Sequence, residues 1–104
     1  MEPVIIVSHI ANSSLAGQEQ RFTQSLVTVG REAGTDIAFD AEEDLVVSHH
    51  HAEFYLEDGK LHLRDLGSRN GTYVNQKRIT EPVELRADDT VHFGYDGPSA
   101  KARL

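Results

Sequence analysis

The chain lacks cysteine and tryptophan among its 104 residues, and only 7% of its residues are aromatic. Without cysteine, neither a disulfide nor a cysteine-based metal site can stabilise the fold. Hydrophobic residues make up 38% of the chain, below the usual share in globular domains, so we expect a modest core of Val, Leu, Ile, Phe and Tyr. The missing cysteine suits a reducing compartment, and we expect a soluble, cytoplasmic domain.

Basic residues are also few. The chain has 10 Lys and Arg against 17 Asp and Glu, which gives a formal net charge of -7. This excess of negative charge opposes nonspecific binding to nucleic acid and to anionic membranes, so neither is an expected partner. No apolar run approaches the length of a membrane-spanning helix, and the N-terminus has no basic-then-apolar signal segment.

A sustained helical period is missing, and no repeat or low-complexity tract is present. Short β-branched or alternating segments are instead separated by turns with Gly, Asn and Asp. The strands are predicted at residues 4–10, 21–24, 26–29, 36–39, 52–56, 60–66, 72–74, 78–79, 83–85, 90–93 and 100–104. Ten to eleven short strands of this kind indicate an all-β fold, a two-sheet β-sandwich.

The length predicts a single domain over residues 1–104. Because the sequence stops in a predicted strand with no polar tail, we expect it to be a fragment of a longer protein. The acidic run from Asp40 to Asp44 is predicted to be a solvated loop. The residues that the alternation assigns to the core in the early and middle strands are Phe22, Leu26, Val27, Val29, Phe54, Leu56, Leu61 and Leu63.

The segment Asp65 to Asn75 is richer in polar groups than a tight turn requires. Its Asn-Gly pair at residues 70–71 is a strong turn signal, because both residues tolerate positive φ. It also carries the guanidinium of Arg69 and the hydroxyls of Ser68 and Thr72. Loops on rigid β scaffolds often carry binding groups. Taken alone, the segment fits a structural turn as well as a binding loop.

Two other predicted strand ends carry similar groups. Gly30-Arg31 offers a guanidinium after a residue that permits close approach of the backbone, and Ser48 offers a hydroxyl. If these loops meet the one with Arg69 and Asn70, they make a site for a doubly charged tetrahedral anion beside a peptide backbone. A guanidinium matches phosphate bidentately, and an Asn amide both donates to and accepts from a main chain. The spacing alone leaves open whether the loops meet.

Four sequence blocks, in order, resemble the forkhead-associated (FHA) domain. They are Gly30-Arg31, Ser48-x-x-His51, the segment from Asp65 to Asn75, and Leu85-x-x-Asp88-Asp89-x-Val91-x-Phe93-Gly94. The resemblance implies a β-sandwich whose loops at one end bind phosphothreonine peptides, without enzymatic activity or a cofactor. The implied partner is a threonine-phosphorylated protein or peptide, which includes a phosphorylated segment of the domain's own parent chain.

The resemblance also implies a role for individual residues. Arg31 and Ser48 would contact the phosphate, and Arg69 would add a contact to phosphate or peptide. Asn70 would hold the peptide main chain next to the phosphothreonine. His51 would be a scaffold residue whose imidazole bonds to loop backbone and holds the Ser48 loop. The two residues that would shape the backbone are Gly30 and Gly71.

Two residues depart from the family pattern. His49 stands where family members most often have Arg, so the cation at this phosphate-binding position is weakened at neutral pH. Bound phosphate would favour its protonation, which predicts tighter binding at about pH 6 than at about pH 8. Gln76 stands where a Gly usually follows Asn75, a change in turn chemistry. Lys77 and Arg78 are predicted to favour an acidic or polar residue a few positions beyond the phosphothreonine.

The sequence argues against a metal site or a hydrolase site built from the same residues. Adjacent residues of a strand point to opposite faces, so His49, His50 and His51 cannot all converge on one metal ion. Ser48 and His51 lack the third orienting group and the nucleophile elbow of a hydrolase. A phosphate-independent protein-interaction or oligomerisation domain on the same fold remains the alternative.

Overall fold

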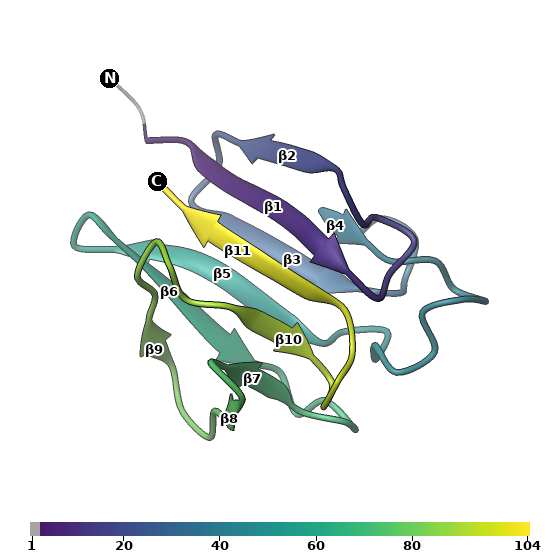
Figure 1. The fold of residues 1–104 in the computed structure, drawn as a ribbon. Coiled ribbons are helices and arrows are strands. Elements are labelled where there is room, and N and C mark those ends of the chain that lie inside the picture. The colour runs from purple at the N-terminus through teal and green to yellow at the C-terminus, as the bar shows by residue number, and fades with distance from the viewer. Residues whose placement is uncertain (1–2) are drawn as a thin grey trace.

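The computed structural model describes residues 3–104 and contains eleven strands in two sheets (Figure 1). The six-stranded sheet has the order β2-β1-β11-β10-β7-β8. Its strands are β1 (Ile5–Ala11), β2 (Glu19–Phe22), β7 (Thr72–Val74), β8 (Lys77–Arg78), β10 (Val91–Phe93) and β11 (Ser99–Arg103).

The five-stranded sheet has the order β4-β3-β5-β6-β9. Its strands are β3 (Leu26–Gly30), β4 (Ile37–Ala38), β5 (Ala52–Glu57), β6 (Lys60–Asp65) and β9 (Val83–Glu84). Neighbouring strands pair antiparallel, except that β3 and β4 are parallel. The predicted all-β, two-sheet sandwich is confirmed. No helix within residues 3–104 is long and apolar enough to cross a membrane.

The core lies between the two sheets, and the alternation of the strands determines which side chains enter it. The largest fully buried apolar side chains are Phe54, Phe93, Ile5, Ile37, Leu63, Val7, Val27, Val29, Val47 and Val91. The prediction for Leu26 is wrong, because its side chain is 42% exposed. Val27 and Val29 point inward from β3, and the pleat therefore turns Leu26 to the outer face.

Two predictions near the first sheet also need correction. The second strand starts earlier than predicted, because Glu19 already pairs with Ser8 of β1. The acidic run is not solvated throughout, since Asp44 is only 6% exposed. Its carboxylate accepts hydrogen bonds from the Ser14 hydroxyl at 2.6 Å and from the Asp40 backbone N–H at 2.8 Å. Asp44 therefore joins two loops.

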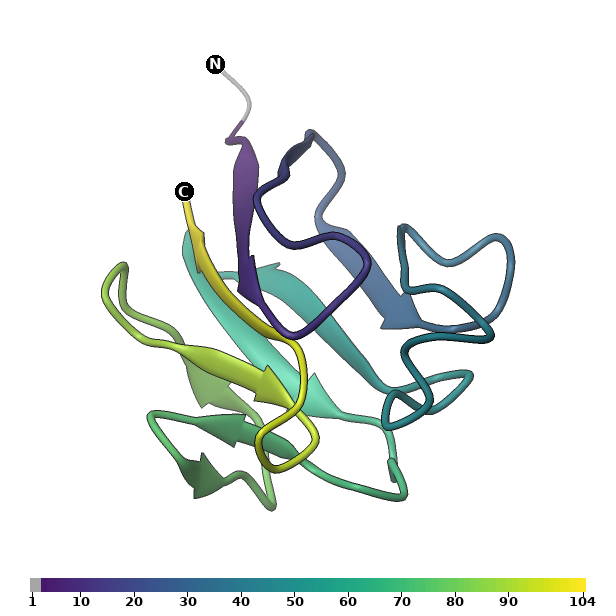
Figure 2. The same cartoon turned by 45° about the vertical axis from the view of Figure 1, so that its right-hand side comes forward.

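Four connections gather at the end of the sandwich away from the two termini (Figures 1 and 2). They follow β3, β4, β6 and β10 and span residues 31–36, 39–51, 66–71 and 94–98. The sheets thus bring together segments that lie far apart in the sequence, including those with Arg31, Ser48 and Asn70.

Candidate functional site

The loop before β5 is held to the end of β3 by Arg31. The backbone N–H of Arg31 donates to the Ser48 carbonyl at 3.1 Å. Its guanidinium donates through Nε to the Val47 carbonyl and through Nη1 to the Ala41 carbonyl, the latter at 2.8 Å. A guanidinium has five N–H donors, so Arg31 keeps donors for a ligand while its position is fixed.

Ser48 and Asn70 join the same loop to the segment after β6. The Ser48 hydroxyl oxygen accepts from the Arg69 backbone N–H at 3.0 Å, which leaves the hydroxyl hydrogen to donate elsewhere. The Asn70 side chain donates through Nδ2 to the Val46 carbonyl at 2.9 Å, which leaves its Oδ1 as an acceptor. The structure thus brings the three loops of the sequence prediction together at one end.

His51 lies beneath this cluster and is fully buried. Its Nε2 donates to the Gly71 carbonyl at 2.8 Å, because a carbonyl can only accept, and Nδ1 therefore accepts from the Ser48 N–H at 3.0 Å. Its ring also packs edge-on against Phe93, with centroids 5.5 Å apart. Burial lowers the pKa of His51, while the bond to Gly71 and the charge of Asp65 act in the opposite direction. The neutral imidazole links the two loops.

Gly30 lets another segment of the same chain, and not a ligand, pack against its backbone. A Cβ at this position would lie 1.9 Å from the carbonyl oxygen of His49, so the loop before β5 packs directly on Gly30. Gly71 has a φ of +85°, which favours glycine, and a Cβ there would lie 2.8 Å from Nε of Arg78 and 3.2 Å from the Tyr73 ring. Both glycines allow the loops to adopt their positions.

The FHA domain family matches residues 27–94, well over half of the chain. Relatives include the glycogen accumulation regulator GarA of Mycobacterium tuberculosis, 38% identical over 74 residues that cover 71% of this chain and 44% of GarA. The oxoglutarate dehydrogenase inhibitor of Corynebacterium diphtheriae is 39% identical over 91 residues, which cover 82% of this chain and 61% of that protein. The chain belongs to the FHA family.

A solved structure with this fold is Mycobacterium tuberculosis EmbR in complex with a low-affinity phosphopeptide. It is 25% identical with a TM-score of 0.82, and the match covers 97% of this chain and 24% of that one. This FHA domain therefore corresponds to one part of longer relatives, since it also spans only 44% of GarA.

Asp65 has a structural role that the sequence did not reveal. Its carboxylate accepts from the N–H of Gly67 at 2.9 Å, from the N–H and hydroxyl of Ser68, and from the hydroxyl of Thr72 at 2.7 Å. Partial burial alone would raise the pKa of Asp65, but these hydrogen bonds and the nearby His51 outweigh it and lower the pKa. Ser68 and Thr72 are buried and their hydroxyls donate to this carboxylate, so they stabilise the loop.

The remaining sequence-predicted residues lie around the cluster. The side chains of His49 and Arg69 are exposed beside it, and the His49 carbonyl accepts from the Glu32 N–H at 3.3 Å. Lys77 and Arg78 form the exposed edge strand β8. Of these two, Arg78 is the one whose side chain contacts the Gly71 segment.

No group of three or more His, Cys, Asp or Glu side chains is arranged to hold a metal ion in the described part of the chain. His50, the middle residue of the histidine run, pairs with Glu32 at 2.5 Å on the surface. His51 points inward, which places the two side chains in different surroundings.

Proposed function

We propose that this FHA domain recognises a threonine-phosphorylated segment of a partner protein. The observation that supports the proposal is the joining of three distant loops at one end of the sandwich. Arg31 bonds to the loop of Ser48, and Asn70 bonds to the same loop from the other side. This arrangement puts two exposed or partly exposed arginines, a hydroxyl and an amide around one short loop.

The phosphate ligands follow from the donors that remain. Arg31 offers its unused guanidinium N–H groups, Ser48 its hydroxyl hydrogen, and Arg69 an exposed guanidinium. Phosphate carries a charge of about -1.5 to -2 and three acceptor oxygens, and hydrogen bonds to charged groups contribute about 1.5–3 kcal/mol each. His49 adds a further imidazole at the edge of the same loop. The preference for threonine rests on the family resemblance.

Asn70 would hold the main chain of the bound peptide. One of its two Nδ2 hydrogens is committed to the Val46 carbonyl, so the amide plane is fixed, and Oδ1 and the second Nδ2 hydrogen are left for the main chain of a peptide. A fixed amide of this kind orders an extended peptide at little entropic cost. The peptide therefore lies across the loop of Val46 to Ser48 on its way past the phosphate.

The relatives support a docking role rather than catalysis. EmbR is solved with a phosphopeptide, and two other relatives are named as a regulator of glycogen accumulation and an inhibitor of oxoglutarate dehydrogenase. We infer that this domain likewise acts by binding another protein, or a phosphorylated segment of its own parent chain, in a signalling pathway. A serine/threonine kinase would switch the interaction on, and a cytoplasmic site of action fits such a kinase.

Calorimetry with one peptide in phosphorylated and unphosphorylated form tests the proposal. We expect an affinity on the order of micromolar, about -8 kcal/mol, for the phosphorylated peptide, and little binding without phosphate. Arg31→Ala should weaken binding about tenfold to a hundredfold, as the loss of charged hydrogen bonds implies. Arg86→Ala, a change at an exposed arginine in the β9–β10 turn, should have no effect. Equal binding of the two peptides would instead establish the phosphate-independent alternative.

The side chains of β8 add a specificity hypothesis. Arg78 lies against Gly71, next to Asn70, and Lys77 precedes it on the same edge strand. These cations favour an acidic or polar residue a few positions beyond the phosphothreonine. A phosphothreonine peptide array would check this. An acidic preference that Arg78→Ala removes would support it, and a preference for basic residues at those positions would refute it.

A further inference from the structure

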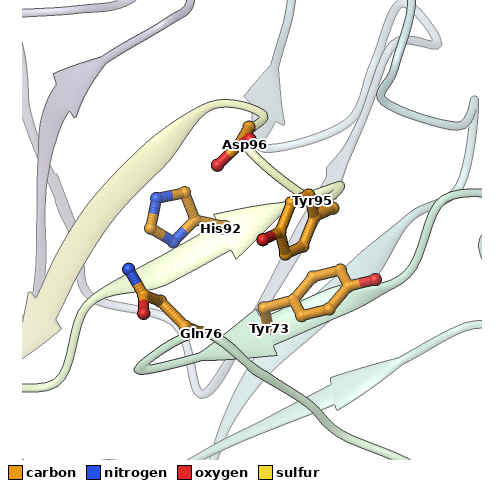
Figure 3. A pocket seen from close by; sticks show the side chains of 5 residues that line it. All are labelled: Tyr73, Gln76, His92, Tyr95 and Asp96. Atoms are coloured by element: carbon orange, nitrogen blue, oxygen red, sulfur yellow. The ribbon is translucent and has the colours of Figure 1, made fainter.

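A small pocket lies on the outer face of the six-stranded sheet, beside the proposed phosphopeptide site. Tyr73, Gln76, His92, Tyr95 and Asp96 line it, and its volume is about 30 Å³ (Figure 3). None of these residues belongs to the proposed phosphate site.

The strand register explains why these side chains meet. His92 of β10 pairs with Tyr73 of β7, and both point outward because Val91 and Phe93 fill the core. The turn after β10 then carries Tyr95 back over the sheet, where its ring packs edge-on against Tyr73 at a centroid distance of 5.7 Å. The Tyr95 ring is still 69% exposed.

The chemistry of the pocket suits a cation. The faces of tyrosine rings attract ammonium and guanidinium groups, and a carboxylate next to them strengthens that attraction. The Asp96 carboxylate takes part in no hydrogen bond or ion pair within residues 3–104. Figure 3 shows it across the His92 ring from the Gln76 amide, with the Tyr95 hydroxyl on the side of its ring that faces His92.

No Lys or Arg side chain of residues 3–104 lines the pocket. The cation–aromatic pair within residues 3–104 is Arg64 over Tyr55, at 4.7 Å on the outer face of the other sheet. Arg78 pairs with Tyr73 across the β7–β8 ladder, and its guanidinium and the Tyr73 ring both lie near Gly71, but Arg78 is not among the residues that line the pocket. A basic group that enters the pocket must therefore come from another molecule or segment.

The turn that carries Tyr95 packs against the proposed phosphopeptide site. The N–H of Gly94 donates to the Gly71 carbonyl at 2.7 Å. A Cβ at Gly94 would lie 3.4 Å from Val46 and 3.6 Å from Asn70, so the turn that carries Tyr95 packs on the residues that would hold the peptide. Tyr73 of the pocket follows Asn70 by three residues, which span at most about 11 Å. An extended peptide advances about 3.3 Å per residue, so a peptide that leaves Asn70 can reach the pocket within a few residues.

We propose that the pocket of Tyr73, Tyr95 and Asp96 takes an arginine or lysine side chain of the same threonine-phosphorylated partner. The proposal rests on the proposed function and adds a charge requirement to it. A partner would then carry a basic residue on the side of the phosphothreonine that faces the β10–β11 turn.

A phosphothreonine peptide array, with arginine placed at each position in turn on an otherwise alanine background, tests the proposal. The 104-residue chain should prefer arginine over alanine about threefold to tenfold at one flanking position. Asp96→Asn and Tyr95→Ala should each abolish that preference and leave dependence on phosphate intact.

Asp58→Asn is the matched control. This substitution removes the same charge as Asp96→Asn, from a residue with a similar backbone conformation. The φ angle is +53° at Asp58 and +55° at Asp96, and Asp58 lies in the β5–β6 turn. It should keep the arginine preference. Phosphate-dependent binding without any preference for a basic residue, or a preference that survives both pocket variants, would overturn the inference. If the wild-type chain shows no dependence on phosphate, the proposed function itself fails, and the inference fails with it.

Discussion

Asp65 organises the loop that carries Arg69 and Asn70. Its carboxylate accepts from two backbone N–H groups and two hydroxyls, those of Ser68 and Thr72. An asparagine at this position presents one oxygen instead of two, and its amide N–H₂ would face donors. We expect Asp65→Asn to lower the free energy of unfolding by about 1.5–3 kcal/mol, measured by urea denaturation.

The control for this change is again Asp58→Asn, which neutralises an exposed turn carboxylate. Its free energy of unfolding should stay within about 0.5 kcal/mol of the wild type. Equal effects of the two substitutions would show that net charge, and not the hydrogen bonds of Asp65, determines the result.

The inward position of Ser68 and Thr72 also marks a limit of the sequence. The sequence shows two hydroxyl side chains in a polar loop, and such side chains can either bind a ligand or stabilise the loop. The choice depends on Asp65, whose oxygens lie within hydrogen-bond distance of both hydroxyls only after β6 and β7 have taken their places. Asp44 is a second example, because the hydroxyl that its buried carboxylate accepts from belongs to Ser14, in a loop 30 residues away.

At the scale of single elements, the β7–β8 turn carries strain. Asn75 and Gln76 have φ angles of +51° and +70°, the pattern of a tight hairpin turn that favours Asn-Gly. Asn tolerates the left-handed region, but Gln pays about 1–2 kcal/mol there. Gln76→Gly relieves this strain, partly offset by the larger entropy of glycine in the unfolded chain.

We therefore expect Gln76→Gly to raise the free energy of unfolding by about 0.5–1 kcal/mol. Thermal or urea denaturation would measure it. Gln24→Gly, in the turn before β3 and without positive φ, should instead leave stability unchanged or lower it. A loss of stability in Gln76→Gly would mean that contacts of the Gln76 side chain outweigh the backbone strain.

Most strands could be predicted because alternation and turn residues agree locally. The β5–β6 hairpin shows this well, with its alternating core residues and a turn at Asp58 and Gly59 that both have positive φ. The start of β2 could not be predicted, because Glu19 and Gln20 are polar and form a strand only through pairing with β1. The outward turn of Leu26 follows from the register of β3 against β5, which the residue types of a short run do not determine.

At the scale of the whole molecule, the spacing of residues in the sequence did not determine whether the loops of the candidate site meet. Arg31, Ser48 and Asn70 contact one another's loops because both sheets end at the same place. That place is set by pairings such as β1 with β11, nearly the full chain apart. The residue types of the site were readable from the sequence, but their common location came only from the family resemblance and now from the structure.

Two buried histidines link the stability of the whole molecule to pH. Burial lowers the pKa of His51, and it also lowers that of His9, whose Nδ1 is buried without a hydrogen-bond partner within residues 3–104. The Nε2 of His9 bonds to Oε1 of Gln20 at 2.7 Å and therefore carries the hydrogen. Protonation at Nδ1 places an uncompensated charge at His9, and in His51 it breaks the bond from the Ser48 N–H.

Between the ordinary histidine pKa of 6.5 and the lowered values, the unfolded chain binds more protons than the folded one. The free energy of unfolding should therefore be constant above about pH 7 and fall as the pH drops below about 6.5, measured by urea denaturation at a series of pH values. The free energy of unfolding of His9→Leu should fall less on acidification than that of the wild type, because only the protonation of His51 still destabilises the folded chain. A free energy of unfolding that stays flat down to about pH 5, or an equal loss in His9→Leu, would contradict this account.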